Sequence, residues 1–196
     1  MKGGSLMAGW NLKAGAITEY VVSEDRIWSL FNFVFSDACK KRNTYKFGLI
    51  KSLLDSAFSG EMTEQGVRYS YEELFGRFAY NYWNLVVKYD LRQMRKDGKS
   101  EFSKIELIFK DVIKENNIFI NLEFESLGAD IKNKIIKQVT VECKRFVIGA
   151  LYDDFDGIIY SFNLKEDGIV LNPRVYDFML KYKAELEKLN YYAWAR

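Results

Sequence analysis

Three residues in the second half of the chain have the types found in a metal-dependent nuclease. Glu142 and Lys144 form a Glu-x-Lys triplet, and Asp130 lies upstream. In nucleases of the PD-(D/E)xK type, an aspartate and a Glu-x-Lys triplet lie on adjacent strands. The carboxylates hold Mg²⁺ and the lysine stabilises the developing negative charge. The three residues therefore predict a stand-alone Mg²⁺-dependent nuclease only if strands bring their side chains together.

The periodicity around this triplet favours a helix. Three residues alternate as in a strand, but five apolar residues recur every four positions, as they do on one face of a helix. These five are Ile131, Ile135, Val139, Cys143 and Val147. With the helical interpretation, Asp130 opens an amphipathic helix, and Glu142 and Lys144 lie on its surface. The sequence then predicts no catalytic residue and no metal ligand in this chain.

Two groups of cations could contact the phosphates of nucleic acid, because lysine and arginine bind the backbone without reading its sequence. The first group lies between the first two expected helices and comprises Lys40, Lys41, Arg42 and Lys46. The second comprises Lys88, Arg92, Arg95, Lys96 and Lys99. All but Lys96 in the second group follow helical spacing, so they share one face if a helix continues that far. The alternative interpretation is a solvated helix face and a loop, with Trp83 packed in the core.

Composition excludes several classes of chemistry. The chain has no histidine, which rules out Ser-His-Asp and Cys-His catalysis and histidine-ligated metals. Its two cysteines, Cys39 and Cys143, are far apart and form no C-x-x-C pair, so structural zinc is not expected. A reduced, cytoplasmic setting fits better than a disulfide scaffold.

The length and charge of the chain predict one sizeable core. The 196 residues are 48% hydrophobic with a net charge of only +2, so nucleic-acid binding has to rest on local patches. No apolar run is long enough for a membrane span, and the first residues do not resemble a signal peptide. Residues 1–6 precede a second methionine, Met7, and are interpreted as a vector remnant or an alternative start.

The elements that must position these residues are mostly helices. Residues 1–22 are expected to be an irregular arm with a short extended piece at 18–22. Helix starts with capping residues are expected at Ser23, Asn43, Ser70 and Ser103. They predict helices over 24–38 and 44–58, a long helix from 70 towards Arg95, and a helix from 103 to about 116.

The last forty residues change period. Residues 157–164 and 168–171 predict a small β-hairpin, and Asn172-Pro173 starts a final helix. The fold class is therefore mainly α: a single domain over 23–196 with about six helices and one hairpin at about 157–171. No glycine or proline ends the final helix, which predicts that the chain is cut from a longer protein.

Five stretches resemble a known family. They are IWSLFNFVFSD (27–37), RNTYKFGLIKSLLD (42–55), NYWNLVVKY (81–89), LNPRVYDFML (171–180) and LNYYAWA (189–195). Together they resemble the N-terminal helical region of bacterial HNH-type endonucleases. In that family a ββα-metal module follows, with paired cysteines around an Asp-His core. The resemblance implies that a divalent metal belongs only to that module, which this sequence lacks.

The expected function is thus a non-catalytic helical domain that contacts the DNA backbone and positions a missing nuclease module. Two alternatives stay open on the sequence alone. The chain could be a protein-binding or self-associating module, or it could be the stand-alone nuclease built on Asp130, Glu142 and Lys144. DNA is the expected partner and no membrane contact is expected.

Overall fold

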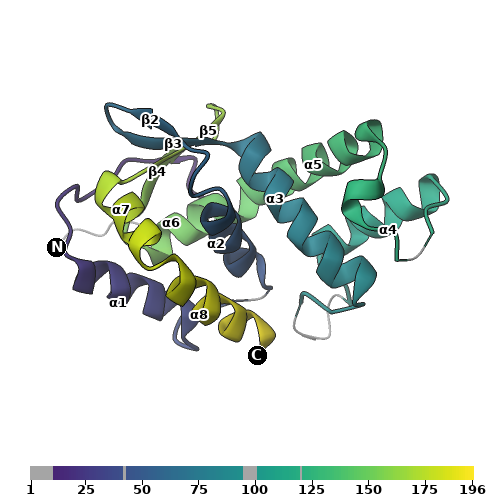
Figure 1. Cartoon of the computed structure of the whole chain (residues 1–196), viewed down its shortest axis with the longest axis horizontal. Helices are drawn as coiled ribbons and strands as arrows, with labels where there is room; N and C mark the ends of the chain where they lie inside the picture. The colour runs from purple at the N-terminus through teal and green to yellow at the C-terminus, as the bar shows by residue number, and fades with distance from the viewer. Residues whose placement is uncertain (1–10, 42, 95–100, 120) are drawn as a thin grey trace.

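The computed structural model describes residues 11–41, 43–94, 101–119 and 121–196. The fold is mainly α with a small antiparallel sheet, as the sequence predicts. Figure 1 shows the sheet at the upper left, with α3 and α5 extending from it towards α4 and with α1 and α8 beneath it. The helices are α1 (Glu24–Phe35), α2 (Tyr45–Asp55), α3 (Tyr71–Trp83), α4 (Lys104–Glu115), α5 (Ala129–Cys143), α6 (Gly149–Asp154), α7 (Pro173–Lys181) and α8 (Lys183–Ala195).

The predicted hairpin is present, but it belongs to a larger sheet. Five strands lie in the order β1-β4-β5-β3-β2. Their bounds are β1 Ala14–Gly15, β2 Glu61–Thr63, β3 Gly66–Ser70, β4 Tyr160–Asn163 and β5 Gly168–Leu171. The hairpin strand β5 pairs antiparallel with β3, in the register Val67 to Leu171. A Cβ at Gly66 would overlap the Leu171 carbonyl oxygen, so the close approach of β3 to β5 at this position requires glycine.

The strands outside the hairpin are corrections to the prediction. The second hairpin, β2–β3, was not predicted because β2 is short and all three of its residues are exposed. The extended piece expected at 18–22 is not a strand; pairing in the arm occurs instead at Ala14–Gly15, against β4. Such short edge pairings carry almost no alternation of apolar and polar residues that a sequence could display.

Four of the five predicted helix caps are confirmed, whereas α2 has Thr44 at its N-cap, one residue after the predicted Asn43. Ser23 and Ser70 accept hydrogen bonds from backbone N–H groups in the first turns of α1 and α3. Asn172 caps α7 from its side-chain oxygen, with Pro173 at the first helical position. The Ser70 box is only half formed, because the Glu73 carboxylate accepts a hydrogen bond from the Ser59 hydroxyl instead.

Three predicted helix ends are wrong. The helix that begins with α3 ends in a π-helical turn at Asn84–Lys88, well before Arg95, and Asp90 then adopts a positive φ of 50°. Helices α1 and α2 both end three residues earlier than predicted. The final helix is divided at Tyr182, whose φ of −114° separates α7 from α8.

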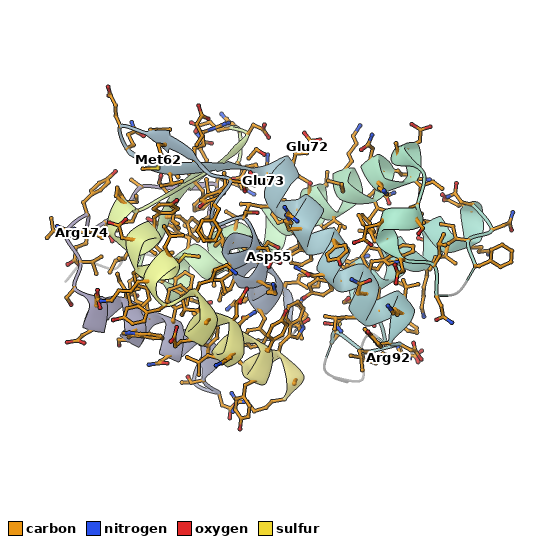
Figure 2. All side chains as sticks on the ribbon, viewed as in Figure 1. Asp55, Met62, Glu72, Glu73, Arg92 and Arg174 are labelled. Atoms are coloured by element: carbon orange, nitrogen blue, oxygen red, sulfur yellow. The ribbon has the colours of Figure 1, made fainter. Side chains whose placement is uncertain are left out.

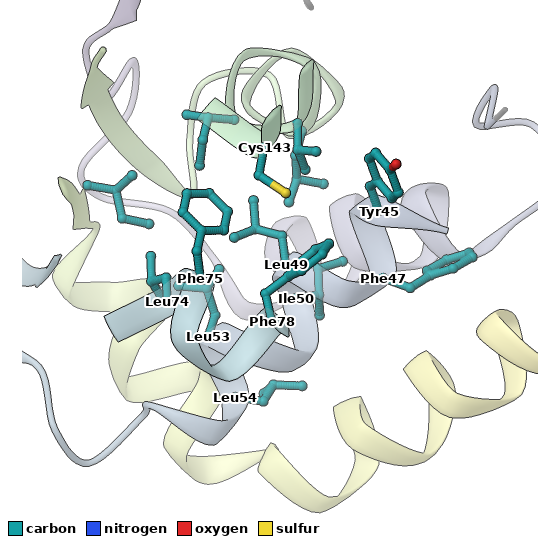
Figure 3. Close-up of a cluster of buried hydrophobic side chains, with 14 of the residues drawn as sticks. Tyr45, Phe47, Leu49, Ile50, Leu53, Leu54, Leu74, Phe75, Phe78 and Cys143 are labelled. Atoms are coloured by element: carbon teal, nitrogen blue, oxygen red, sulfur yellow. The ribbon is translucent and has the colours of Figure 1, made fainter. Parts of the chain in front are cut away.

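Buried apolar side chains of the helices and the sheet form one continuous cluster. Figure 3 shows Leu49 of α2 and Phe75 and Phe78 of α3 gathered beside Cys143 of α5. Both cysteines are buried and free. Within the described ranges, none of the helices has the length and apolar character that crossing a bilayer demands.

The cap at Ser103 gives a first testable prediction. The Ser103 Oγ accepts from Glu106 N at 3.3 Å, and Ser103 N donates to Glu106 Oε2 at 2.7 Å, with both residues buried. We expect Ser103→Ala to lower the free energy of unfolding by about 1–2 kcal/mol, measured by urea denaturation. Ser29→Ala, at an exposed position inside α1, is the matched control and should change stability by less than about 0.5 kcal/mol. Equal effects of the two variants would contradict the capping role.

Candidate nucleic-acid interface

The structure does not bring Asp130 together with Glu142 and Lys144. Asp130 and Glu142 lie near opposite ends of α5, separated by about 18 Å of helical rise. Lys144 lies in the π-helical turn that follows, with its Nζ 4.4 Å from the centre of the Tyr71 ring. Partial burial raises the pKa of Glu142, against the opposing charges of Lys104 and Arg145. This segment is helical, so it lacks the adjacent strands that the stand-alone nuclease needs.

The described part of the chain also holds no cluster of candidate metal ligands. Among these residues, no group of three or more cysteine, aspartate or glutamate side chains is arranged to hold a metal ion.

The first group of cations is largely engaged within the fold. Lys41 Nζ donates to the carbonyl oxygens of Ser36 at 2.6 Å and Cys39 at 3.0 Å, and partial burial lowers its pKa. Lys46 forms a largely buried ion pair with Asp154. Lys40 is exposed, and Arg42 lies outside the described residues.

In the second group, Lys88 and Arg92 do not share a helix face, because the helix ends at Lys88. Lys88 pairs with Glu123 at 3.2 Å. Arg92 lies beyond the helix in an irregular segment, below the end of α3 in Figure 2. The remaining members, Arg95, Lys96 and Lys99, fall outside the described residues.

The structure nevertheless gathers cations from three distant segments around one hollow. We call this hollow the cationic pocket and define it by Lys41, Arg92 and Arg196; its volume is about 290 Å³. Asp37 is the one acidic side chain among its described lining residues. Lys41 comes from the loop before α2, Arg92 from the segment after α3, and Arg196 follows α8. The pocket therefore unites members of both predicted groups.

Arg92 is a cation of this pocket whose present ion-pair partner is exposed to solvent. Its guanidinium donates to the carboxylate and the carbonyl of Glu101, each at 3.1 Å, and it lies 3.9 Å from the centre of the Phe102 ring. The Arg92 side chain is 43% exposed and that of Glu101 68%. An ion pair this exposed contributes little stability, so a phosphate could replace Glu101 at small cost.

Arg196 is the member that the sequence analysis missed. Its Nη2 donates to the Phe35 carbonyl at 2.8 Å, and its Nη1 lies 3.8 Å from Asp37. Nothing near Arg196 in sequence marks it as part of a basic patch. Only the packing of α8 across the ends of α1 and α2 brings it beside Lys41.

A buried glutamine fixes the segment that carries Arg92. Gln93 Oε1 accepts from the Thr44 hydroxyl at 2.8 Å and from Trp194 Nε1 at 3.0 Å. Thr44 Oγ1 in turn lies 2.7 Å from the hydroxyl of Tyr82. These bonds connect the segment to α2, α3 and α8, so the position of Arg92 does not depend on its own surface ion pair.

A second hollow lies on the other side of Gln93. We call it the aromatic pocket and define it by Tyr80, Tyr191 and Trp194; its volume is about 490 Å³. Arg92, Gln93, Trp194 and Ala195 line both pockets. The two pockets are therefore adjacent and have Arg92 in common.

Comparison with known proteins finds no relative of this chain: no protein-family model, no curated protein and no solved structure matches it.

Proposed function

We propose that this chain is a non-catalytic helical scaffold that binds the phosphate backbone of DNA, with the cationic pocket as the point of contact. The convergence of Lys41, Arg92 and Arg196 on one hollow is the observation that carries the proposal. A cluster of lysine and arginine side chains around one concavity is the arrangement that favours phosphate oxygens.

The geometry suits recognition of the backbone rather than of a base sequence. The described lining of the cationic pocket belongs to loops and helix ends, and the pocket presents no exposed helix face that could enter a major groove. We therefore propose binding that is salt-dependent and nearly independent of sequence. The resemblance to HNH-type endonucleases supports this role for a region that holds DNA beside a metal module. The proposal assigns the described residues no catalytic step.

Reversal of charge at Arg92 tests the contact. We expect Arg92→Glu to weaken the affinity for a perfect DNA duplex about tenfold at low salt, and to reduce the slope of log K against log salt by about one. Fluorescence anisotropy between about 50 mM and about 200 mM salt measures both quantities. Lys165→Glu is the matched control, because Lys165 is an exposed lysine of the β4–β5 turn, away from the pocket lining.

A second variant separates a DNA contact from a structural role of Arg92. Glu101→Gln removes the carboxylate that pairs with the Arg92 guanidinium. This variant should therefore strengthen DNA binding, whereas Arg92→Glu weakens it. Absence of binding at both salts, or equal losses in Arg92→Glu and Lys165→Glu, would contradict the proposal. A tight dimer that ignores DNA, seen by light scattering, would favour the self-association alternative.

A further inference from the structure

The aromatic pocket has the size and the lining of a site for a flat heteroaromatic ring. Its volume of about 490 Å³ lies within the range of small-molecule sites in proteins. Tyr80, Tyr191 and Trp194 supply aromatic surface, and Asn81 and Asn84 supply amide groups. This combination of rings with a few polar groups is how proteins hold an unstacked nucleobase.

Two of these rings are held in place before any ligand arrives. The indole of Trp194 donates to Gln93 Oε1 at 3.0 Å, and its ring centre lies 5.3 Å from that of Tyr82. Tyr191 lies with its ring centre 5.6 Å from Lys51 Nζ. A stacking surface that is already ordered loses little conformational freedom on binding.

The cation beneath Tyr191 is itself fixed by a network of charges. Lys51 is buried, pairs with Asp55 one turn along α2, and lies 3.7 Å from Glu187 of α8. The other oxygen of Asp55 accepts a hydrogen bond from Asn81 Nδ2 at 2.9 Å. Burial alone would lower the pKa of Lys51, but the hydrogen bond to Asp55 and the negative charges of Asp55 and Glu187 together outweigh it and raise that pKa, so this group stays charged at neutral pH. The network therefore orients both Tyr191 and Asn81.

The amides leave hydrogen-bonding capacity for a ligand. Asn81 uses its nitrogen on Asp55 and keeps its oxygen as an acceptor. The side chain of Asn84 has no hydrogen-bond partner among the described residues, so it offers both a donor and an acceptor. An asparagine side chain can pair with the edge of an adenine through these two groups.

Arg92 gives the aromatic pocket a cation that could pair with the phosphate of a ligand. Lys51 and Arg92 are the charged side chains among the described residues of the aromatic pocket, and no aspartate or glutamate joins them there. Arg92 also lines the cationic pocket. A ring in one pocket can therefore carry its own phosphate into the other.

We propose that the aromatic pocket binds one unpaired nucleobase while Arg92 holds its phosphate. This inference rests on the proposed function, since it requires that the DNA contacted by the scaffold is locally unpaired. The shared chemistry is a base joined to a sugar phosphate, which a nucleic-acid strand or a free nucleotide can supply.

The test compares three probes by fluorescence anisotropy: a perfect duplex, the same duplex with one bulged adenine, and a single strand. We expect the bulged duplex to bind more tightly than the perfect one. Tyr191→Ala should weaken binding of the bulged duplex and the single strand by roughly 5- to 100-fold and leave the perfect duplex unchanged. Tyr191→Phe keeps the ring and should retain the preference. Tyr191 is 54% exposed, so its removal does not open the core.

Deoxyadenosine monophosphate distinguishes the two sources. Competition by the free nucleotide at micromolar concentration assigns the pocket to mononucleotides, whereas competition only by the strand assigns it to an extruded base. Equal affinity for bulged and perfect duplexes, with no effect of Tyr191→Ala on any probe, would overturn the inference while leaving backbone binding intact. If the wild-type protein does not bind the perfect duplex, the proposed function is refuted. If it still binds the bulged duplex through Tyr191, the inference about the aromatic pocket is supported.

Discussion

Trp83→Ala is expected to lower the free energy of unfolding by about 3–5 kcal/mol, enough to remove much of the stability of a domain of this size. Trp83 is fully buried, and its ring centre lies 5.3 Å from that of Phe109 and 5.9 Å from that of Phe124. Its Nε1 donates to the Leu122 carbonyl at 2.8 Å. Truncation would open a cavity and leave that carbonyl without its donor. Urea denaturation followed by circular dichroism measures the loss.

One further variant separates the two contributions of the indole, and a second variant at an exposed aromatic residue is the control. Trp83→Phe keeps a ring in the cavity and loses the hydrogen bond, so it should cost less than half as much as the alanine variant. Tyr192→Ala removes an aromatic side chain that is 68% exposed and should cost less than about 1 kcal/mol. A loss below about 1 kcal/mol for Trp83→Ala would show that the tryptophan does not hold α3 against α4.

Asp154→Ala is expected to cost about 3 kcal/mol, because it would leave the Lys46 ammonium largely buried without a counter-ion. The side chains of Lys46 and Asp154 are only 16% and 17% exposed, and the pair joins α2 to α6. Thermal and urea unfolding of the single variants and of Lys46→Met/Asp154→Leu measure the coupling. The double variant should recover to within about 1 kcal/mol of the wild type, since apolar replacements leave no isolated charge.

A neighbouring ion pair supplies the control. Arg26 and Asp156 also pair across the fold, but their side chains are 43% and 58% exposed. Arg26→Ala should therefore cost less than about 1 kcal/mol. If Asp154→Ala costs no more than Arg26→Ala, or if the double variant is as unstable as Asp154→Ala, the buried pair does not carry the stability assigned to it.

The sequence predicts those parts of the fold whose causes are local. Ser23, Ser103 and Asn172 mark helix starts because a capping side chain bonds to an N–H two or three residues away. Helix ends were predicted less well, since α3 ends in a π-helical turn that no glycine or proline announces. The β2–β3 hairpin was missed because β2 is short and exposed, and because β3 pairs with β5, about a hundred residues later in the chain.

The candidate site, too, was predictable from the sequence only in part. Lys41 and Arg92 were predicted as members of two separate basic groups, and the assumed helix joining Arg92 to Lys88 does not exist. Their proximity to each other and to Arg196 depends on how α8 packs against α2, which no local pattern reveals. The aromatic pocket was missed for the same reason, because it forms only where Tyr191 and Trp194 of α8 meet Tyr80 of α3.

The shared position of Gln93 between the two pockets has a thermodynamic consequence. Gln93 and Trp194 line both hollows, and their mutual hydrogen bond fixes the wall that separates them. Because this wall is already ordered, neither the base nor the phosphate of a ligand spends conformational entropy on it. Since the two groups belong to one ligand, binding of either group would hold the other at a high effective concentration beside its own pocket.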